Sequence, residues 1–526
     1  MNPGRLTGPF GKTEVRAPTA DQAAAFDHTA IVERGVPEAA LMENAGQRAA
    51  LIVEHLLPSG RVVATVGAGN NGGDALVCLR ALAAWGRDVL AVAVGGRNRS
   101  DPVLHGWDIP CRRFDPGRPG AAEELAGVLA GAGVVVDGLL GTGIRGAPRA
   151  PHAAAIGLVN EAGRPVVALD APSGVDGNTG EVRGEAVRAD VTVCFGWPKL
   201  GTLLYPGRDL CGRVVAVEIG FPPPETEGWA RLATPGWARE AFPRRPSVTH
   251  KYDVGALAVV AGSAMPGAAI LSTRAAFRCG VGLVRVCATG PAAAVLGEVP
   301  EALFVDTADE EALRDAVLRS DALAIGPGMG TGARAGRQLQ LALQARESRP
   351  AVIDADALTL LAGRPGGGPG QRLGANTVVT PHPGEMAGLT ARTVAAIQRD
   401  RVATARDFAA AHGVVTLLKG TPTLVADPEG GLLVSTQEGG SDLAVAGMGD
   451  VLTGAIGSFL AQGVEPVAAA GLALHVTGRA AARDGLGAAL VPSDVVEAIP
   501  EALSEEGCGD TDLPFPFVTF DQRRHG

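Results

Sequence analysis

Short runs of β-branched residues alternate with Ala-rich amphipathic stretches in the first half of this chain, and this alternation limits its possible folds more than any other feature. The runs expected to form strands are 61–66, 89–94, 134–137, 165–170, 191–195 and 214–218. Buried strands separated by helical stretches are typical of parallel sheets, because each helix returns the chain to the same edge of the sheet. The pattern therefore predicts an α/β fold with a doubly wound parallel sheet.

A second series of the same kind follows a break in the periodicity. The break begins at the Phe-Pro-Pro-Pro run 221–224, and a stretch containing Pro and Trp continues to about Arg245. The strands expected after it are 256–261, 283–287, 322–325, 351–354, 377–380 and 414–419. A chain of 526 residues also exceeds what one hydrophobic core usually supports. We predict two α/β domains, 1–222 and 245–526, with a linker at 223–244; the polar end, 505–526, is expected to fray.

Net charge, cysteine content and hydropathy argue against several classes of protein. The formal net charge of −10 provides no basic surface for a nucleic-acid backbone, so no nucleic-acid partner is expected. The seven cysteines include no C-x-x-C pair and are expected to be reduced thiols, as in the cytoplasm. No segment approaches the roughly 18 uninterrupted apolar residues of a membrane span, so we expect a soluble protein without a membrane partner.

The first expected strand leads into the sequence G-A-G-N-N-G-G-D at 67–74, which contains the pattern G-x-G-x-x-G. Glycines at such a turn allow helix N-terminal amides to approach a pyrophosphate, as in a dehydrogenase. Asp74 at the helix start would repel that anion, or would simply complement the helix dipole. No acidic residue ends the second strand to hold a ribose, although Arg97 and Arg99 could accommodate a 2′-phosphate. A dehydrogenase is a weakened alternative that these residues leave open.

Polar residues follow several strands of this first sheet at their carboxyl ends, where doubly wound folds place their sites. Asn70 and Asn71 offer amide groups to a polar ligand or a hard cation. Asp137 ends one strand and is followed by the G-T-G sequence 141–143, and Asp170 ends the next, before the turn-forming sequence A-P-S-G-V-D. Each could be simple turn chemistry, but their convergence on one sheet edge favours a binding site.

The second domain carries glycine-rich and polar motifs after its strands, at 262–269, 326–330, 380–385, 419–423 and 447–450. The sequence G-M-G-D at 447–450 opens a helix, so its backbone amides can hold a phosphoryl group while Asp450 receives a hydroxyl proton. Lys419 ends a strand and favours a nucleotide phosphate, although a surface cation is an even alternative. No G-x-x-x-x-G-K-[ST] loop is present, so a nucleotide is not held as in P-loop proteins.

The first domain resembles the NAD(P)H-hydrate epimerases over about 19–220. The resemblance rests on L-M-E-N-A-G at 41–46, N-N-G-G-D at 70–74, Asp137 with G-T-G, and D-A-P-S-G at 170–174. It implies a Rossmann-like fold, with Asp170 as substrate contact and acid/base. The hydrated nucleotide would also contact Asn70, Asn71, Gly72, Gly73, Asp74, Gly141, Thr142, Gly143, Ile144, Arg145, Gly146 and Ala147. A potassium ion would be held by Asn71, Asp137 and Ser173.

The second domain resembles the ADP-dependent NAD(P)H-hydrate dehydratases, which have a ribokinase-like fold, over about 245–502. The resemblance implies that Asp450 is catalytic and that the hydrate contacts Ala268, Gly328, His382 and Asp450. It places the adenine nucleotide, with Mg²⁺, on Lys419, Gly420, Thr421, Pro422, Thr423 and Gly449. His382 has a simpler alternative as a buried turn histidine.

Together the two resemblances predict a bifunctional enzyme that repairs hydrated NADH and NADPH, and we also expect a homo-oligomer. The first domain would interconvert the R and S hydrates at ring carbon 6. The second would phosphorylate the S hydrate with ADP, so that phosphate leaves and NAD(P)H, AMP and phosphate result. The alternative is a ribokinase-like small-molecule kinase with a non-catalytic nucleotide- or protein-binding first domain.

Overall fold

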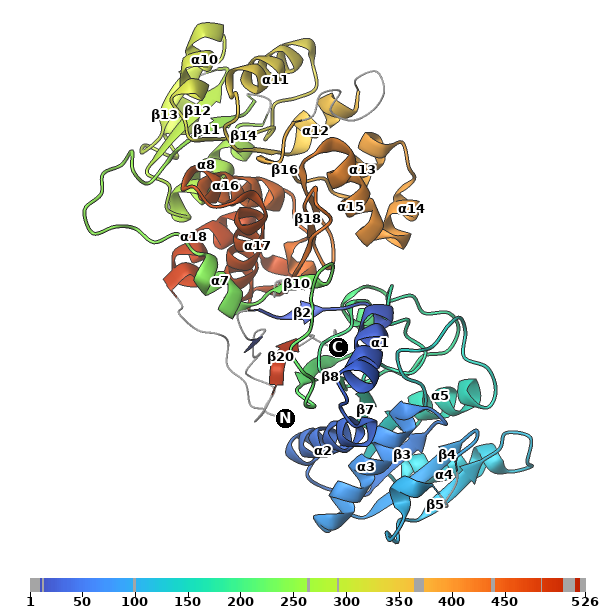
Figure 1. Ribbon diagram of the computed structural model, residues 1–526. Coiled ribbons are helices and arrows are strands. Elements are labelled where there is room, and N and C mark those ends of the chain that lie inside the picture. The colour runs from blue at the N-terminus through green and yellow to red at the C-terminus, as the bar shows by residue number, and fades with distance from the viewer. Residues whose placement is uncertain are drawn as a thin grey trace. The chain divides into compact units, whose positions relative to one another are not determined.

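The computed structural model describes residues 10–11, 14–97, 101–262, 265–290, 293–363, 373–436, 440–483, 485–504 and 516–520. The chain forms two compact units, one of residues 1–230 with 508–526 and one of residues 231–507. Each unit contains a mainly parallel sheet with helices packed against it (Figure 1). The predicted α/β fold class is therefore confirmed.

The sheet of the first unit has the strand order β1-β20-β9-β8-β7-β6-β3-β4-β5. From β9 to β5 every pair is parallel, whereas β20 is antiparallel to β9 and β1 is antiparallel to β20. The strands of this sheet are β1 (Phe10–Gly11), β3 (Val62–Val66), β4 (Val89–Val94), β5 (Cys111–Phe114), β6 (Val134–Gly138), β7 (Val166–Leu169), β8 (Val191–Phe195), β9 (Arg213–Val217) and β20 (Pro516–Phe520). The short strand β2 (Arg16–Ala17) is not part of this sheet.

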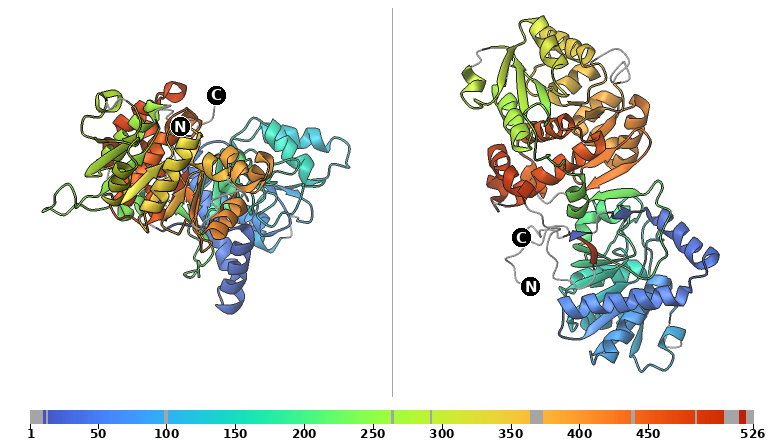
Figure 2. Two further views of the ribbon diagram at one scale, coloured as in Figure 1. Left: turned by 90° about the horizontal axis from the view of Figure 1, so that it is seen from above. Right: turned by 60° about the vertical axis from the view of Figure 1, so that its left-hand side comes forward.

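Helices cover both faces of this sheet because the side chains of its strands alternate in direction. Val62, Ala64 and Val66 of β3 pack with α2 and α3, whereas Val63 lies in the cluster with α4 and α5. Figure 2 shows the same layers from two further directions. The longer helices are α1 (Ala20–His28), α2 (Glu38–Leu56), α3 (Asn70–Ala84), α4 (Ala121–Ala130) and α5 (His152–Glu161), with a one-turn α6 (Gly207–Leu210) and a π-helix, η1 (Thr29–Glu33).

The sheet of the second unit follows the order β13-β12-β11-β14-β15-β16-β17-β18-β19-β10. Its pairs are parallel except for β17-β18 and β18-β19, which are antiparallel. The strands are β10 (Ala230–Ala233), β11 (Ala256–Val260), β12 (Leu283–Ala288), β13 (Leu303–Asp306), β14 (Ala322–Ile325), β15 (Ala351–Ile353), β16 (Thr377–Val379), β17 (Val415–Leu418), β18 (Leu424–Ala426) and β19 (Leu432–Ser435).

One large core joins this sheet to α8, α16, α17 and α18, where Phe459 of α16 is almost fully buried. The helices are α7 (Pro235–Ala241), α8 (Pro266–Arg278), α9 (Ala293–Leu296), α10 (Glu310–Leu318), α11 (Ala333–Ala345), α12 (Ala355–Ala362), α13 (Pro383–Thr390), α14 (Val394–Arg399), α15 (Arg401–His412), α16 (Met448–Ala461), α17 (Pro466–Arg483) and α18 (Pro492–Ser504).

Two segments differ from the expected organisation. The stretch 223–244 contains β10 and α7, and β10 pairs with β19, so the chain is already part of the second sheet there. The expectation that 505–526 frays is wrong for Pro516–Phe520, which forms β20 and pairs with β9 of the first unit. Strands such as β10 and β20 carry little sequence signal, because the strands with which they pair are distant along the chain.

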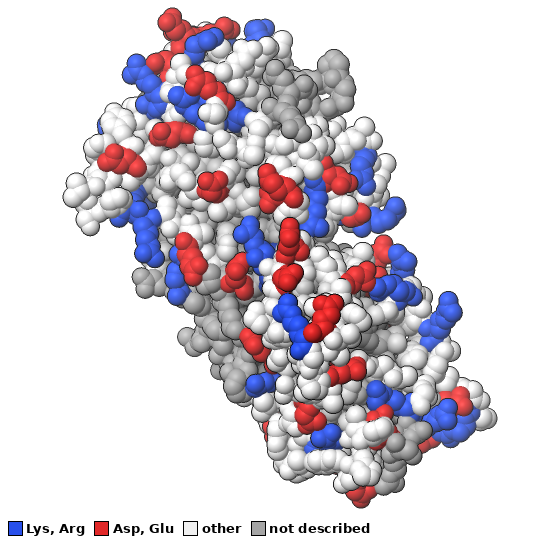
Figure 3. Space-filling model, in the orientation of Figure 1, with Lys and Arg blue, Asp and Glu red and all other residues white. Residues whose placement is uncertain are grey.

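The described residues contain no long apolar helix, and the face in Figure 3 shows no concentration of one charge. Among the described residues, none of the helices combines the length and the apolar character that crossing a membrane requires. Lys and Arg side chains are interspersed with Asp and Glu side chains on the face in Figure 3.

Candidate functional site

The turn between β3 and α3 is closed so tightly that two of its glycines cannot be replaced without movement. A Cβ atom on Gly67 would lie 1.8 Å from the carbonyl oxygen of Leu139, and one on Gly72 would lie 2.0 Å from the carbonyl oxygen of Gly67. The turn thus presses against the end of β6 and begins α3 at Asn70. Arg97 donates to the Gly69 carbonyl and pairs with Asp101, while Arg99 lies outside the described residues.

Asn71, Asp137 and Ser173 meet at the carboxyl ends of β6 and β7. The Leu140 carbonyl accepts from Asn71 Nδ2 at 3.0 Å and from Ser173 Oγ at 3.1 Å. Ser173 also donates to Asp137 through its hydroxyl at 2.7 Å and its backbone amide at 2.8 Å. Burial raises the pKa of Asp137 to about 6, although the Ser173 hydrogen bonds oppose the rise. Asn71 Oδ1 is buried and has no hydrogen-bond partner among the described residues.

Asp170 lies in the left-handed region at φ 64° and forms an ion pair with Lys199, which sequence reasoning did not identify. Lys199 is only 4% exposed and also donates to the Phe195 carbonyl at 2.9 Å. Burial lowers the pKa of Lys199, but the charge and hydrogen bond of Asp170 together with the other neighbouring acidic groups outweigh burial, so the net pKa is raised. The other carboxylate oxygen, Asp170 Oδ2, accepts only a long bond from Thr142 Oγ1, at 3.3 Å, among the contacts the structure describes.

A cavity of about 560 Å³ opens at this edge of the first sheet. The predicted residues that line it are Asn70, Asn71, Asp74, Gly141, Thr142, Gly143, Ile144 and Asp170. Burial, followed by repulsion from Asp170, raises the pKa of Asp74 well above its usual value. The wall also contains residues that no motif indicated, namely Asp27, Trp197, Lys199 and Phe221.

The remaining predicted residues of this site do not line the cavity. Gly72 and Gly73 lie in the first turn of α3, where a Cβ on Gly73 would meet Met42 at 2.6 Å. Arg145 forms an ion pair with Asp21, and Gly146 has a left-handed φ of 79°. These residues and Ala147 shape the turns around the cavity, and their contact with a substrate stays a prediction.

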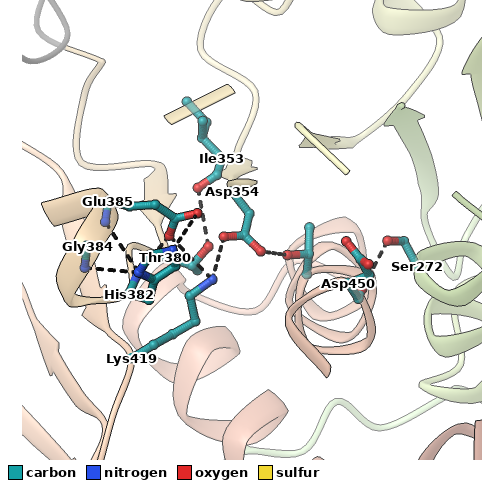
Figure 4. A network of polar contacts seen from close by, with 10 residues as sticks. Ser272, Ile353, Asp354, Thr380, His382, Gly384, Glu385, Lys419 and Asp450 are labelled. Atoms are coloured by element: carbon teal, nitrogen blue, oxygen red, sulfur yellow. Dashed lines mark hydrogen bonds and ion pairs between the residues drawn. The ribbon is translucent and has the colours of Figure 1, made fainter. Parts of the chain in front are cut away.

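In the second unit, the Lys419 ammonium group does not face solvent alone but forms an ion pair with Asp354 (Figure 4). Asp354 follows β15, is 2% exposed and accepts from Lys419 Nζ at 2.7 Å and from Thr453 Oγ1 at 2.7 Å. Burial raises the pKa of Asp354, but Lys419 and the hydrogen bonds lower it more, so the net pKa is lowered. Glu385 lies 3.7 Å from Lys419 Nζ as a second acidic neighbour.

Asp450 lies in the first turn of α16, three residues after Gly447, which is the N-cap of the helix and has a left-handed φ of 95°. Ser272 Oγ of α8 donates to the Asp450 carbonyl at 3.0 Å and fixes this turn against α8. Burial and, next, the charge of Asp354 raise the pKa of Asp450, Lys419 opposes the rise, and the net pKa is about 6. A Cβ on Gly449 would lie 3.4 Å from Asp354 Oδ2 and 3.5 Å from Lys419 Nζ, so the missing side chain leaves the ion pair accessible from the helix end.

His382 is a helix cap rather than a buried turn residue. Its Nδ1 accepts from the amides of Gly384 at 3.0 Å and Glu385 at 3.3 Å, and Glu385 Oε2 accepts from the His382 amide at 2.8 Å. The ring remains 55% exposed, so its Nε2 side can meet a ligand. Gly328 is left-handed at φ 59°, and a Cβ there would lie 3.4 Å from Cβ of Ala268. Positions 263 and 264 of that motif lie outside the described residues.

Arg401 holds the loop that follows β17 in place, although it belongs to none of the sequence motifs. Arg401 Nη2 donates to the carbonyls of Leu418 at 3.2 Å, Lys419 at 3.2 Å and Pro422 at 3.0 Å. A Cβ on Gly420, at φ 138°, would lie 2.7 Å from the guanidinium. Because three carbonyls are turned toward Arg401, Thr421 and the ammonium of Lys419 remain available to a ligand.

Asp354 carried a signal that could have been used. It ends the expected strand 351–354, as Asp137 and Asp170 end theirs in the first domain. Lys199, Asp27 and Arg401 carried none, because each lies outside a glycine-rich motif and reaches its site only through the fold.

Comparison with known proteins gives a match to each domain. The family model described as NAD(P)H-hydrate dehydratase matches residues 257–501, and the model described as YjeF-related protein N-terminus matches residues 38–201. The bifunctional NAD(P)H-hydrate repair enzyme of Moorella thermoacetica is 35% identical and covers 92% of this chain and 96% of its own length. The enzyme of Salinibacter ruber is 36% identical, with 93% and 96% covered.

This chain belongs to the bifunctional NAD(P)H-hydrate repair enzymes. The predicted family is confirmed, as are the Rossmann-like first and ribokinase-like second domains that it implies. The relatives also include an enzyme of that name from Leishmania infantum, 34% identical with 91% of this chain and 92% of the relative covered. Neither a dehydrogenase nor a simple small-molecule kinase is favoured by these matches.

Solved structures similar to this chain include an ADP/ATP-dependent NAD(P)H-hydrate dehydratase from Bacillus subtilis, co-crystallized with ATP and Mg²⁺. It is 28% identical, has a TM-score of 0.46, and covers 52% of this chain and 98% of its own. A ribokinase-like superfamily protein from Enterococcus faecalis is 24% identical, has a TM-score of 0.48, and covers 55% and 99%.

Proposed function

We propose that the second domain dehydrates the S hydrate of NADH or NADPH by phosphorylating its hydroxyl group with ADP, and that the first domain interconverts the R and S hydrates. The observation that carries the proposal is the position of Asp450. Asp450 lies in the first turn of α16, next to the Asp354–Lys419 pair, and its pKa is raised to about 6, mainly by burial. A carboxylate with such a pKa is suited to accept a proton near neutral pH.

In the dehydratase step, Asp450 would accept the proton of the hydroxyl on ring carbon 6. The hydroxyl oxygen forms a bond to the β-phosphorus of ADP, and the bond from that phosphorus to the bridging oxygen breaks, which releases AMP. The ring nitrogen lone pair then expels phosphate from carbon 6, and loss of a proton from carbon 5 restores the dihydropyridine. The amides at the start of α16 are suited to stabilise the phosphoryl oxygens.

The nucleotide would lie on the loop after β17. Lys419, Gly420, Thr421, Pro422, Thr423 and Gly449 are the residues that we propose to contact ADP. Ala268, Gly328 and His382 would contact the hydrate. Mg²⁺ would be held mainly by phosphate oxygens and water, because the described part of the chain has no cluster of three or more His, Cys, Asp or Glu that could hold a metal ion.

In the epimerase domain, the cavity would hold the hydrated nucleotide, with Asp170 as acid/base. Potassium would be held by Asn71, Asp137 and Ser173, and the unpartnered Asn71 Oδ1 fits an oxygen ligand for such a cation. Bound potassium supplies a fixed positive charge next to the cavity. Asp137 and Ser173 orient the turn after β6, which holds Thr142 within reach of Asp170.

The proposal is tested by adding the purified chain to a mixture of both hydrates of NADH with ADP and Mg²⁺. Recovery of the full absorbance of the reduced nicotinamide ring, with one AMP and one phosphate per ring, is the expected result. Recovery that stops at the S hydrate would remove the epimerase half, and a stable phosphorylated product would identify a kinase. The cytoplasmic location and the homo-oligomer stay predictions.

A further inference from the structure

Helix α1 contributes a carboxyl group, Asp27, to the cavity that holds Asp170 and Lys199. The residue belongs to no glycine-rich motif and has no role in the mechanism above. It is accessible to solvent, and within its own helix it is followed by the π-helix η1, from which Ile31 also lines the cavity. Such local widening of a helix is frequent at functional sites.

The fold fixes this helix against the segment that carries Lys199. Thr19 and Gln22 form a capping box at the start of α1, and the Leu200 amide donates to the Pro18 carbonyl at 2.7 Å. At the other end, the ring of Phe26 packs edge-on against Trp197, with centroids 5.4 Å apart. Leu200 and Trp197 flank Lys199, so Asp27 and Lys199 are held in one rigid frame.

The aromatic residues next to Asp27 form a wall of the same cavity. Trp197 and Phe221 both line it and stack at 5.3 Å with an interplanar angle of 17°. Phe26 and Trp229 complete the cluster behind them. Aromatic residues make up only 4% of the sequence, so this gathering at one end of a cavity is suited to a flat ring.

The ionisable groups that line the cavity are unbalanced in charge. They include four carboxyl groups, those of Asp27, Glu38, Asp74 and Asp170, against the single ammonium of Lys199, and burial lowers the pKa of His152. Desolvation raises the pKa of Asp27, Lys199 lowers it, Asp170 and Glu38 raise it, and the net pKa is about 6. Asp170 forms an ion pair with Lys199, whereas Asp27, like Asp74, has a raised pKa and can carry a proton near neutral pH. The cavity therefore contains groups suited to act as a base and as an acid.

Inversion at ring carbon 6 needs two such groups. The base removes the hydroxyl proton, the oxygen electron pair forms a C=O bond, and the bond between carbon 6 and the ring nitrogen breaks. The acid protonates that nitrogen. Rotation about the bond between carbons 5 and 6 exposes the other face, the nitrogen attacks it, and both protons return. The step balances without an additional reactant or water.

We infer that Asp27 is the second acid–base group of the epimerase, acting on the ring nitrogen while Asp170 acts on the hydroxyl, with the hydrated ring against Trp197 and Phe221. This inference rests on the proposed epimerase function. It assigns the aromatic end of the cavity to the hydrated ring and leaves the α3 end, with Asn70 and Gly141, to the nucleotide phosphates.

The test uses the full chain with purified R hydrate of NADH and ADP, followed by the return of reduced-nicotinamide absorbance. Asp27→Asn should lower conversion of the R hydrate by about 100-fold, within the range for loss of a general acid or base. Asp27→Glu should retain part of the rate. The matched control is Glu33→Gln, which removes an exposed carboxyl six positions later in the same helical segment and should leave the rate unchanged.

Three readouts separate the outcomes. Dehydration of the S hydrate must stay at the wild-type rate, which shows that the second unit is intact, and the Tm of the first unit must stay at the wild-type value, which shows that the substituted unit is folded. The wild-type rate on the R hydrate should fall as pH rises above about 6, and this fall should be absent in Asp27→Asn. If wild type converts the R hydrate and Asp27→Asn converts it equally fast, the inference is overturned; if wild type itself fails, the epimerase proposal is.

Discussion

The two domains each place an Asp–Lys ion pair at the carboxyl end of a parallel strand, but the pairs are built differently. In the second domain, both oxygens of Asp354 are occupied, one by Lys419 and one by Thr453, at 2.7 Å each. In the first, Lys199 occupies Asp170 Oδ1, whereas Asp170 Oδ2 accepts, among the described residues, only a long bond of 3.3 Å from Thr142.

We propose that an oxygen without a short hydrogen bond, rather than the ion pair itself, distinguishes the reactive carboxylate of the first domain from the structural carboxylate of the second. Asp354 is saturated and almost fully buried, so it can only hold Lys419 in place. The proton acceptor of that domain must then be a different residue, and Asp450 is available. In the first domain Lys199 is the buried partner, and Asp170 has one oxygen that we propose contacts the substrate.

The largest effect is expected from Asp450→Asn. The variant cannot accept the hydroxyl proton, so dehydration of the S hydrate should fall by about 1000-fold, within the range for general-base catalysis. The measurement is the initial rate of reduced-nicotinamide recovery with ADP. Epimerisation should not change, and Asp407→Asn, an exposed carboxyl on α15, is the matched control.

The same variant also separates catalysis from stability. The folded pKa of Asp450 is raised to about 6, so its ionisation opposes folding once the pH exceeds its unfolded value. Asp450→Asn should therefore raise the Tm at neutral pH while activity is lost. A lowered Tm would mean that Asp450 is a structural residue like Asp354.

Asp170→Asn should lower epimerisation by about 100-fold, the lower end of the general acid–base range. It should also destabilise the first unit, because Lys199 is left buried without its partner. The double variant Asp170→Asn with Lys199→Met should regain the Tm but not the rate. Recovery of both by the double variant would show that the pair is only structural.

Asp354→Asn should reduce stability more than chemistry. Breaking a buried ion pair costs about 3 kcal/mol, so thermal unfolding of the second unit should move to lower temperature. The folded pKa of Asp354 lies below its unfolded value, so this stabilisation is present above the unfolded pKa and is lost as pH falls through the folded one. The Tm difference between wild type and variant should therefore shrink in acid.

Dehydration should depend on pH through Asp450. Because the carboxylate form accepts the proton and its pKa is raised to about 6, kcat/KM should fall about tenfold for each pH unit below that value. The profile is measured with the S hydrate at saturating ADP. A flat profile down to pH 5 would indicate another base.

The smallest effect is expected from Arg401→Lys. A lysine cannot reach three carbonyls at once, so the loop after β17 should loosen and KM for ADP should rise about fivefold, or about 1 kcal/mol. The kcat should stay near wild type, because Arg401 does not touch the reacting atoms. An equal loss of kcat would mean that the loop also positions Asp450.

Much of the site follows from local sequence. The glycines of 67–74 and the left-handed Gly447 are required by the backbone itself, so their motifs predicted the turns before α3 and α16. Asp137 and Asp170 were also predicted, because each ends a strand that the local sequence pattern indicates. The strand β20 was not predicted, because it depends on pairing with β9, which is distant along the chain.

The two α/β domains, the family and the turns that carry Asp170 and Asp450 could be predicted from the amino-acid sequence alone. These features depend on short sequence patterns and local backbone conformation. Which charged groups form ion pairs depends on the tertiary structure. Lys199 reaches Asp170, Lys419 reaches Asp354, and Asp27 enters the cavity from α1. Ion pairing and desolvation sum over atoms that are close in space but distant along the chain, and no local pattern encodes that sum.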